Sequence, residues 1–185
     1  ATPILADCNI DDFCIDPEKI FEKISDKTKA ILPVHFAGNS CDMKNIMQLA
    51  NDHSLYVIED CAHAIETTFN GKHAGTYGDF GCFSFYATKN LVTGEGGMLL
   101  ARNSEKLKQI KKIALHGMSL DAWDRFSEDG LKHYDIVAPG FKYNKTDIQA
   151  ALGIHQLARI EENWLKRKKI WQFYSDQFAN LPIDL

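Results

Sequence analysis

The chain has 185 residues, of which 45% are hydrophobic and 25% charged, and its 21 Lys and Arg against 25 Asp and Glu give a formal net charge of −4. This length and apolar content are enough for one packed core and exclude global disorder. The mild acidity, without a basic face, argues against nucleic acid as a partner, and no apolar run approaches the ~20 residues of a membrane helix.

Short apolar runs alternate with helical patterns along the first part of the chain. This order is typical of a mainly parallel sheet flanked by helices, a three-layer α/β fold. Asp16, Asp42 and Ser104 are the residues expected to cap three of the helices, and Pro33 moves its strand toward an edge of the sheet. We expect helices over 17–24, 43–53 and 105–115, strands over 30–36, 56–60, 80–85 and 97–101, and a strand end at 4–7.

The pattern changes after Gly117. Residues 123–130 are polar and irregular, and 138–140 have the composition of a turn. Apolar residues at helical spacing then predict a helix over 147–161 and a second one over 164–178. The basic run 166–169 at the start of the second helix is expected to be a solvated face.

The five cysteines form no CxxC pair. Their odd number and irregular spacing favour a reducing, cytoplasmic setting, and the first residues lack the features of a signal peptide. A zinc site could be assembled from Cys61, His63 and Cys82. Structural zinc normally uses two close ligand pairs, however, so we expect no metal.

Three clusters of polar residues lie at strand ends, where ligands bind in parallel α/β folds. They occupy 59–63, 84–90 and 93–97. The glycines at 94–97 precede a strand and so do not form a dinucleotide-binding fingerprint, and neither a P-loop nor a hydrolase nucleophile elbow is present. Each cluster also has a plain structural interpretation: a capping acid, a surface lysine and a flexible turn.

Together these clusters supply an acid, a lysine and several hydroxyl or amide donors. Pyridoxal 5'-phosphate (PLP) requires this set, because a lysine binds its aldehyde, a carboxylate holds its pyridine nitrogen and polar donors hold its phosphate. The carboxylate keeps the ring nitrogen protonated, so that the ring can accept electrons from the substrate carbon. The sequence therefore predicts a PLP site.

Several motifs resemble the DegT/DnrJ family of PLP-dependent sugar aminotransferases, which have the fold-type I aminotransferase architecture. They are EDCAHA at 59–64, GDFGCFSF at 78–85, TKN at 88–90 and GEGG at 94–97, with further similarity at 16–20, 28–35, 116–118 and 143–151. Family members are about twice this length. The resemblance thus implies that 1–160 is the PLP-binding large domain without its N-terminal part, and that 161–185 is the helix leading to an absent C-terminal small domain.

The resemblance also implies residue roles. Lys89 would bind the cofactor covalently and carry the proton, and Asp60 would pair with the pyridine nitrogen. His63 would lie beside the ring hydroxyl, and Ser84 would bind the phosphate. Asn144 would reach the phosphate in the neighbouring subunit, which implies a homodimer with shared active sites. Further candidates for substrate contact are Glu95, His116 and Lys142.

The implied activity is transfer of an amino group, with glutamate as donor, to the keto group of a nucleotide-linked deoxysugar in aminosugar and polysaccharide biosynthesis. A relative acting on a cyclitol-type ketone, a non-catalytic PLP-binding or regulatory protein, and a plain α/β interaction domain remain alternatives. The family's sugar dehydratases have histidine in place of the lysine, so Lys89 argues against that activity.

Overall fold

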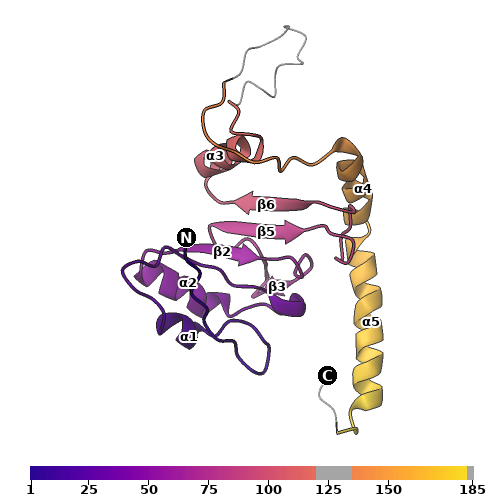
Figure 1. Cartoon of the computed structure of the whole chain (residues 1–185). Helices are drawn as coiled ribbons and strands as arrows, with labels where there is room; N and C mark the ends of the chain where they lie inside the picture. The colour runs from indigo at the N-terminus through magenta and orange to yellow at the C-terminus, as the bar shows by residue number, and fades with distance from the viewer. Residues whose placement is uncertain (120–134, 183–185) are drawn as a thin grey trace.

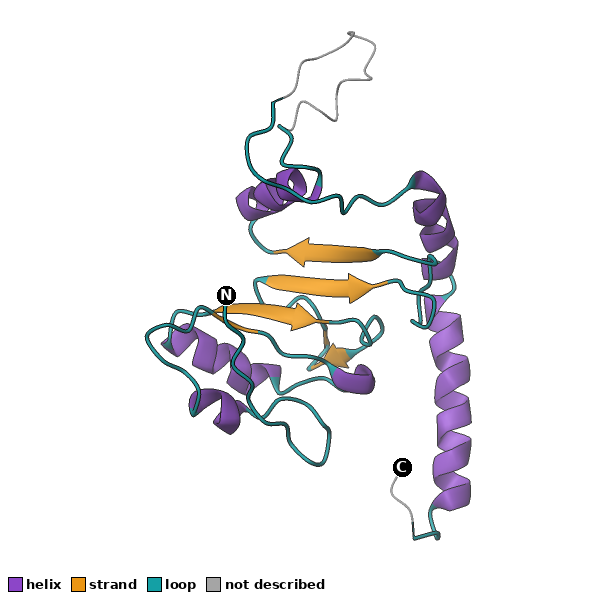
Figure 2. Ribbon diagram, in the orientation of Figure 1, coloured by secondary structure: helices purple, strands orange, loops and turns teal. Residues whose placement is uncertain are grey.

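A four-stranded sheet forms the centre of the fold in the computed structural model, which describes residues 1–119 and 135–182 (Figures 1 and 2). The strand order is β1-β2-β5-β6. The first three strands run parallel, and β6 runs antiparallel to β5. The mainly parallel sheet predicted from the sequence is therefore confirmed. The strands are β1 (Ala30–Ile31), β2 (Tyr56–Asp60), β5 (Phe80–Ser84) and β6 (Gly97–Ala101).

Helices flank the sheet on both faces. The helices α1 (Pro17–Phe21) and α2 (Met43–Asp52) pack with β1 and β2 around one core cluster. These helices pack on the face of β2 that carries Val57. Tyr56 lies on the other face, where the ammonium group of Lys106 in α3 (Ser104–Ala114) is 3.6 Å from the centre of the Tyr56 ring. Successive side chains of a strand point to opposite faces, so α3 and α2 lie on different sides of the sheet.

The helix α2 shows how the sequence determines this packing. Asp42 accepts a hydrogen bond from the backbone N–H of Asn45 and so caps the helix, as predicted. Met43, Ile46 and Ala50 recur at helical spacing, and all three are buried against β1 and β2. The cap and the apolar stripe together fix both the start of the helix and the face that it buries.

Several predicted boundaries were wrong. The segment 30–36 forms only the two-residue strand β1 and an isolated bridge at Val34, because Pro33 has no N–H to donate to a strand ladder. Residues 4–7 form no strand, and the first helix ends at Phe21. Asn103, not Ser104, caps α3. The irregular segment 123–130 lies outside the described residues.

Two short elements escaped prediction. One is the 3₁₀ helix η1 (Phe36–Gly38). The other is a hairpin of β3 (Thr68–Phe69) and β4 (Lys72–His73), joined by Asn70 and Gly71, which both have positive φ angles. Asn-Gly between two strands favours this two-residue turn, so the sequence did contain a signal for it.

The last two helices are α4 (Asp147–Leu157) and α5 (Ile160–Phe178). Thr146 and Gln149 form a capping box at the start of α4, and the break between the helices falls at 158–159, earlier than predicted. In Figure 1 both helices stand beside the end of the sheet toward which the β2 and β5 arrows point. No helix in the described ranges has the length and apolar character needed to cross a membrane.

Candidate active site

Two adjacent acids end strand β2, and the strand directs them to opposite faces of the sheet. The Glu59 side chain is fully buried on the same side as Val57. Asp60 is half-buried and lines a pocket on the other side, together with Ile58. Because side chains alternate along a strand, the Glu59 side chain points into the interior and the Asp60 side chain faces the pocket.

The Glu59 carboxylate organises the interior of this part of the fold. It accepts hydrogen bonds from the backbone N–H groups of Gly75 at 2.7 Å, Tyr77 at 2.7 Å and Gly78 at 2.6 Å. Gly75 has φ +80°, and a Cβ atom added there would lie 2.6 Å from the ring of Phe83. The turn 75–78 can therefore approach the carboxylate only with glycine at this position.

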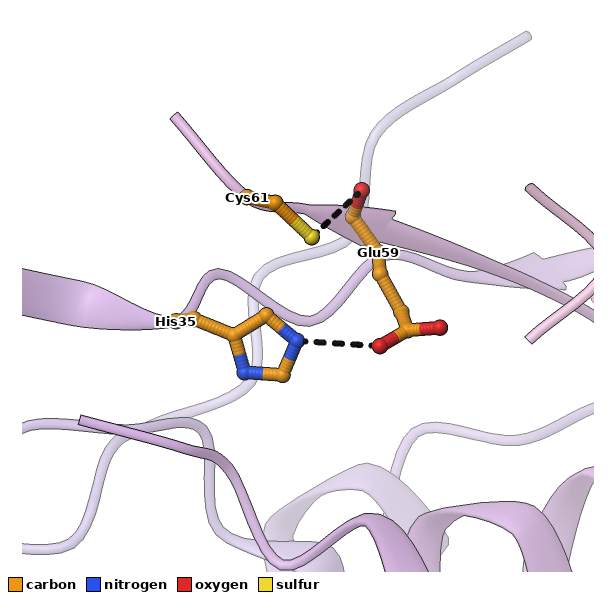
Figure 3. Close-up of side chains that lie close together, drawn as sticks. All are labelled: His35, Glu59 and Cys61. Carbon is orange, nitrogen blue, oxygen red and sulfur yellow. Dashed lines mark hydrogen bonds and ion pairs between the residues drawn. The ribbon is translucent and has the colours of Figure 1, made fainter. Parts of the chain in front are cut away.

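A fourth hydrogen bond to Glu59 comes from His35, which is also fully buried (Figure 3). His35 Nδ1 accepts the backbone N–H of Cys41 at 3.1 Å, so Nε2 carries the proton and donates to Glu59 at 3.1 Å. Burial raises the pKa of the Glu59 carboxyl, but the hydrogen bonds from His35, Gly78 and Gly75 outweigh this effect and lower the pKa below its usual range.

Cys61 lies beside this pair, and the potential ligand atoms of Cys61, His35 and Glu59 come within 4.8 Å of one another. Their bonding nevertheless favours a structural role. Both ring nitrogens of His35 and both oxygens of Glu59 already have protein partners. Burial, together with the charges of Glu59 and Asp60, raises the pKa of the Cys61 thiol to about 12, whereas a metal requires the thiolate.

Asp60 and Ser84 line one pocket. Asp60 Oδ1 accepts the backbone N–H of Ala62 at 2.9 Å, so Asp60 does stabilise the turn that follows β2. Among the described residues its side chain makes no other hydrogen bond. Ser84, at the end of β5, is half-buried, and the Tyr86 N–H lies 3.4 Å from its hydroxyl oxygen. The pocket is lined by Leu32, Ile58, Glu59, Asp60, Ala62, Cys82, Phe83 and Ser84.

Lys89 and His63 line a second pocket. Lys89 is half-buried in the loop after β5, and within the described part of the chain its ammonium group has no hydrogen bond or ion pair. His63 is exposed, and its Nδ1 accepts the backbone N–H of Ala37 at 3.3 Å. The pocket is lined by Ala37, Ala62, His63, Thr88, Lys89 and Asn90. Because Ala62 lines both pockets, the pockets adjoin.

The other candidates lie elsewhere. Asn144 is exposed in the loop before α4 and lines neither pocket. His116 and Lys142 belong to two paired segments, since the His116 N–H donates to the carbonyl of Phe141 and Leu115 pairs with Lys142. Glu95 is exposed, and its backbone carbonyl accepts the hydroxyl of Thr93 at 2.8 Å.

Glu66 and Arg167 were not predicted as part of the site, although Glu66 bonds to Asn90, the residue after Lys89. Glu66, in the loop that carries His63, accepts a hydrogen bond from Asn90 at 2.9 Å and forms an ion pair with Arg167 of α5. All four residues of the basic run 166–169 are exposed, as predicted for a solvated face, and Arg167 in addition pairs with Glu66. Its neighbour Lys166 pairs with Glu162 at 2.6 Å, and both side chains lie on the exposed surface of α5.

The donor set fits PLP. Among the described residues, Asp60 has no charged partner and lines one pocket together with the Ser84 hydroxyl, and Lys89 has none either and lines the adjoining pocket together with the His63 imidazole. Glu59 is fully engaged in the interior, which leaves Asp60 as the acid able to meet a ring nitrogen. The cofactor supplies an aldehyde for a lysine, a basic ring nitrogen for a carboxylate and a phosphate for hydroxyl donors.

Comparisons with known proteins agree with this chemistry. The profile of the DegT/DnrJ/EryC1/StrS aminotransferase family matches residues 1–185. The spore coat polysaccharide biosynthesis protein SpsC of Bacillus subtilis is 46% identical over 182 residues, which are 98% of this chain and 47% of SpsC. The uncharacterized protein MJ1066 of Methanocaldococcus jannaschii is 48% identical over 181 residues, again 98% of this chain and 47% of the relative.

Solved structures show the same similarity. The putative sugar aminotransferase Spr1654 of Streptococcus pneumoniae in its PMP form is 34% identical, with a TM-score of 0.88 over 97% of this chain and 50% of that one. Its PLP form gives a TM-score of 0.87. The chain spans about half the length of the curated relatives that it matches.

Proposed function

The chain belongs to the DegT/DnrJ/EryC1/StrS aminotransferase family, and on that premise we propose that the full-length protein transfers an amino group to the keto group of a nucleotide-linked deoxysugar. We further propose glutamate as the amino donor. The observation that carries this proposal is the placement of Asp60 and Lys89 in adjoining pockets, with Glu59 withdrawn into the interior. The family uses PLP, which supplies the electron-accepting ring for this reaction.

The two central residues have separate tasks in this proposal. The Asp60 carboxylate would keep the pyridine nitrogen of the cofactor protonated, and the hydrogen bond that Asp60 accepts from the Ala62 N–H orients this carboxylate. Lys89 would hold the cofactor through its aldehyde, and the Lys89 amine would carry the proton to and from the substrate carbon. Its half-buried position, without an ion pair among the described residues, leaves the amine available for both steps.

The remaining residues position the cofactor. His63 would contact the ring hydroxyl from the pocket that it shares with Lys89, and Ser84 would bind the phosphate. We propose that the exposed Asn144 serves the phosphate of a neighbouring subunit, so that the protein acts as a homodimer. We also propose that 1–160 form part of the large domain and that α5 leads to a smaller one.

We place the reaction in the cytoplasm. All five cysteines are free thiols in the structure, and three of them are buried. Reducing compartments keep cysteines unpaired, so this state supports the proposed location.

The test is an amination assay on the full-length protein with PLP, glutamate and a panel of nucleotide-linked keto sugars, in which the amine product is detected by mass spectrometry. Lys89→Ala is expected to lower turnover at least about 100-fold, because the proton carrier is lost. Lys44→Ala, on the exposed face of α2, is the control. A wild-type protein that binds PLP but aminates none of the ketones would contradict the proposal and favour a regulatory role.

A further inference from the structure

Glu66 joins three parts of the molecule that are distant in sequence. One carboxylate oxygen accepts the side-chain N–H of Asn90 at 2.9 Å, and the other pairs with the guanidinium of Arg167, 101 residues away. The Glu66 side chain is only 8% exposed. A carboxylate this well buried requires partners for its charge, and here it has one cation and one neutral donor.

The loop that carries Lys89 is held at both ends by the same region of the fold. Phe85 precedes the loop and Leu91 follows it, and both are buried with Ile160, the first residue of α5. Ile65, next to Glu66, packs against this cluster. The apolar contacts therefore attach the two ends of the loop to α5, and the hydrogen bond from Asn90 to Glu66 holds the last residue of the loop.

We propose that Glu66 is a positioning residue that fixes Lys89 relative to His63 and Asp60. Asn90 follows Lys89 directly and lines the same pocket as Lys89 and His63. Glu66 lies three residues after His63, in the loop that follows Asp60 at the end of β2. A hydrogen bond from Asn90 to Glu66 thus sets the distance between the two halves of the site, and Arg167 holds the carboxylate in place from α5. The inference rests on the proposed function.

The charge on Glu66 distinguishes this arrangement from simple packing. An ion pair with charge-assisted hydrogen bonds restricts the carboxylate more strongly than a neutral contact does. The planar guanidinium of Arg167 donates such a bond to Glu66. Glu66→Gln keeps an oxygen that can accept from Asn90 but removes the charge that Arg167 requires. Glu66→Ala removes both contacts. The two variants therefore separate the link to Asn90 from the link to α5.

The test measures hydrogen exchange and cofactor capture in the full-length protein. In Glu66→Ala, the amides of 86–91 are expected to exchange about tenfold faster than in wild type, while those of α2 keep their rates. The apparent PLP affinity, followed by the absorbance of the Lys89-bound cofactor, is expected to fall about tenfold as well. Glu66→Gln should change the exchange rates at 86–91 and the apparent PLP affinity less than Glu66→Ala does. Arg167→Met should change both quantities by the same amount as Glu66→Gln.

Glu162→Gln is the matched control, because it breaks an exposed ion pair on the same helix. It is expected to leave both measurements at wild-type values. Wild-type rates at 86–91 in Glu66→Ala would overturn the inference, and so would an equal increase at α2, which would indicate general loosening. If wild-type Lys89 captures no PLP, the proposed function fails, while the exchange rates still decide the role of Glu66.

Discussion

The sheet region buries its apolar side chains within the chain, whereas the two C-terminal helices, α4 and α5, leave most of theirs exposed. Between Cys14 and Leu91 the sequence supplies two complete buried clusters and most of a third, which Ile160 of α5 completes, and the buried polar pair His35 and Glu59 is hydrogen-bonded. Within the described part of α4 and α5, only Ile160 is buried. Their large apolar side chains stay exposed, and examples are Ile148 at 78%, Ile154 at 69% and Phe173 at 60%.

This difference shows which contacts stabilise each region. The sheet region is stabilised by contacts inside the chain. The helix α4 is fixed locally by its capping box, and its apolar residues face outward. Exposed apolar area of this extent marks a surface for further protein contacts. Since the chain spans about half the length of its curated relatives, such contacts agree with the proposed second domain and dimer.

The largest expected effect breaks the interior of the sheet region. Glu59→Ala leaves His35 and three backbone N–H groups without their acceptor, so the free energy of unfolding should fall by about 3 to 5 kcal/mol. Urea denaturation of the 185-residue chain measures it. Glu162→Ala, which removes an exposed ion pair, should leave the midpoint unchanged. Equal midpoints for wild type and Glu59→Ala would refute the central role of this carboxylate.

A second, smaller effect is the acid sensitivity of the same region. The pKa of Glu59 is lower in the folded protein than in the unfolded chain, so its contribution is complete above the unfolded value of about 4.3 and is lost as the pH falls through the folded value. We therefore expect Glu59→Gln to be less stable than wild type at pH 7, and the difference in the free energy of unfolding to shrink at pH 4 and 3. Urea denaturation at pH 7, 5, 4 and 3 measures this difference. A constant difference across this range would contradict the assignment.

The smallest expected effect sharpens the contrast with the C-terminal helices. Leu152 in α4 is 53% exposed, so Leu152→Ala should change the stability of the 185-residue chain by no more than about 0.5 kcal/mol. The control Ile46→Ala, at a fully buried position, should cost about 2 to 5 kcal/mol. In the full-length protein, Leu152→Ala should weaken dimer formation, as sedimentation velocity would detect. An unchanged dimer would show that this face is not an interface.

Local patterns in the sequence predicted much of the architecture and the central candidates of the site. Short apolar runs indicated β2 and β5, and helix caps indicated α2 and the start of α1. The same reasoning directed attention to the strand ends that carry Asp60 and Lys89, which the structure places in adjoining pockets.

The contacts that support the site could not be predicted in this way. Three of the partners of Glu59 are backbone N–H groups 16 to 19 residues further along, and backbone donors leave no trace in residue type. Glu66 and Arg167 are 101 residues apart, so neither helical nor strand spacing relates them. Their partnership depends on how α5 lies beside the sheet, which only the tertiary structure defines.

The central claim is that Lys89 is the residue that binds PLP, and covalent trapping tests it most directly. The full-length protein would be mixed with PLP, reduced with borohydride and digested, and its peptides would be analysed by mass spectrometry. We predict a pyridoxyl group on Lys89 in wild type, and its loss in Lys89→Arg. A folded wild-type protein with Lys89 unmodified, or with the label on another lysine, would contradict the assignment.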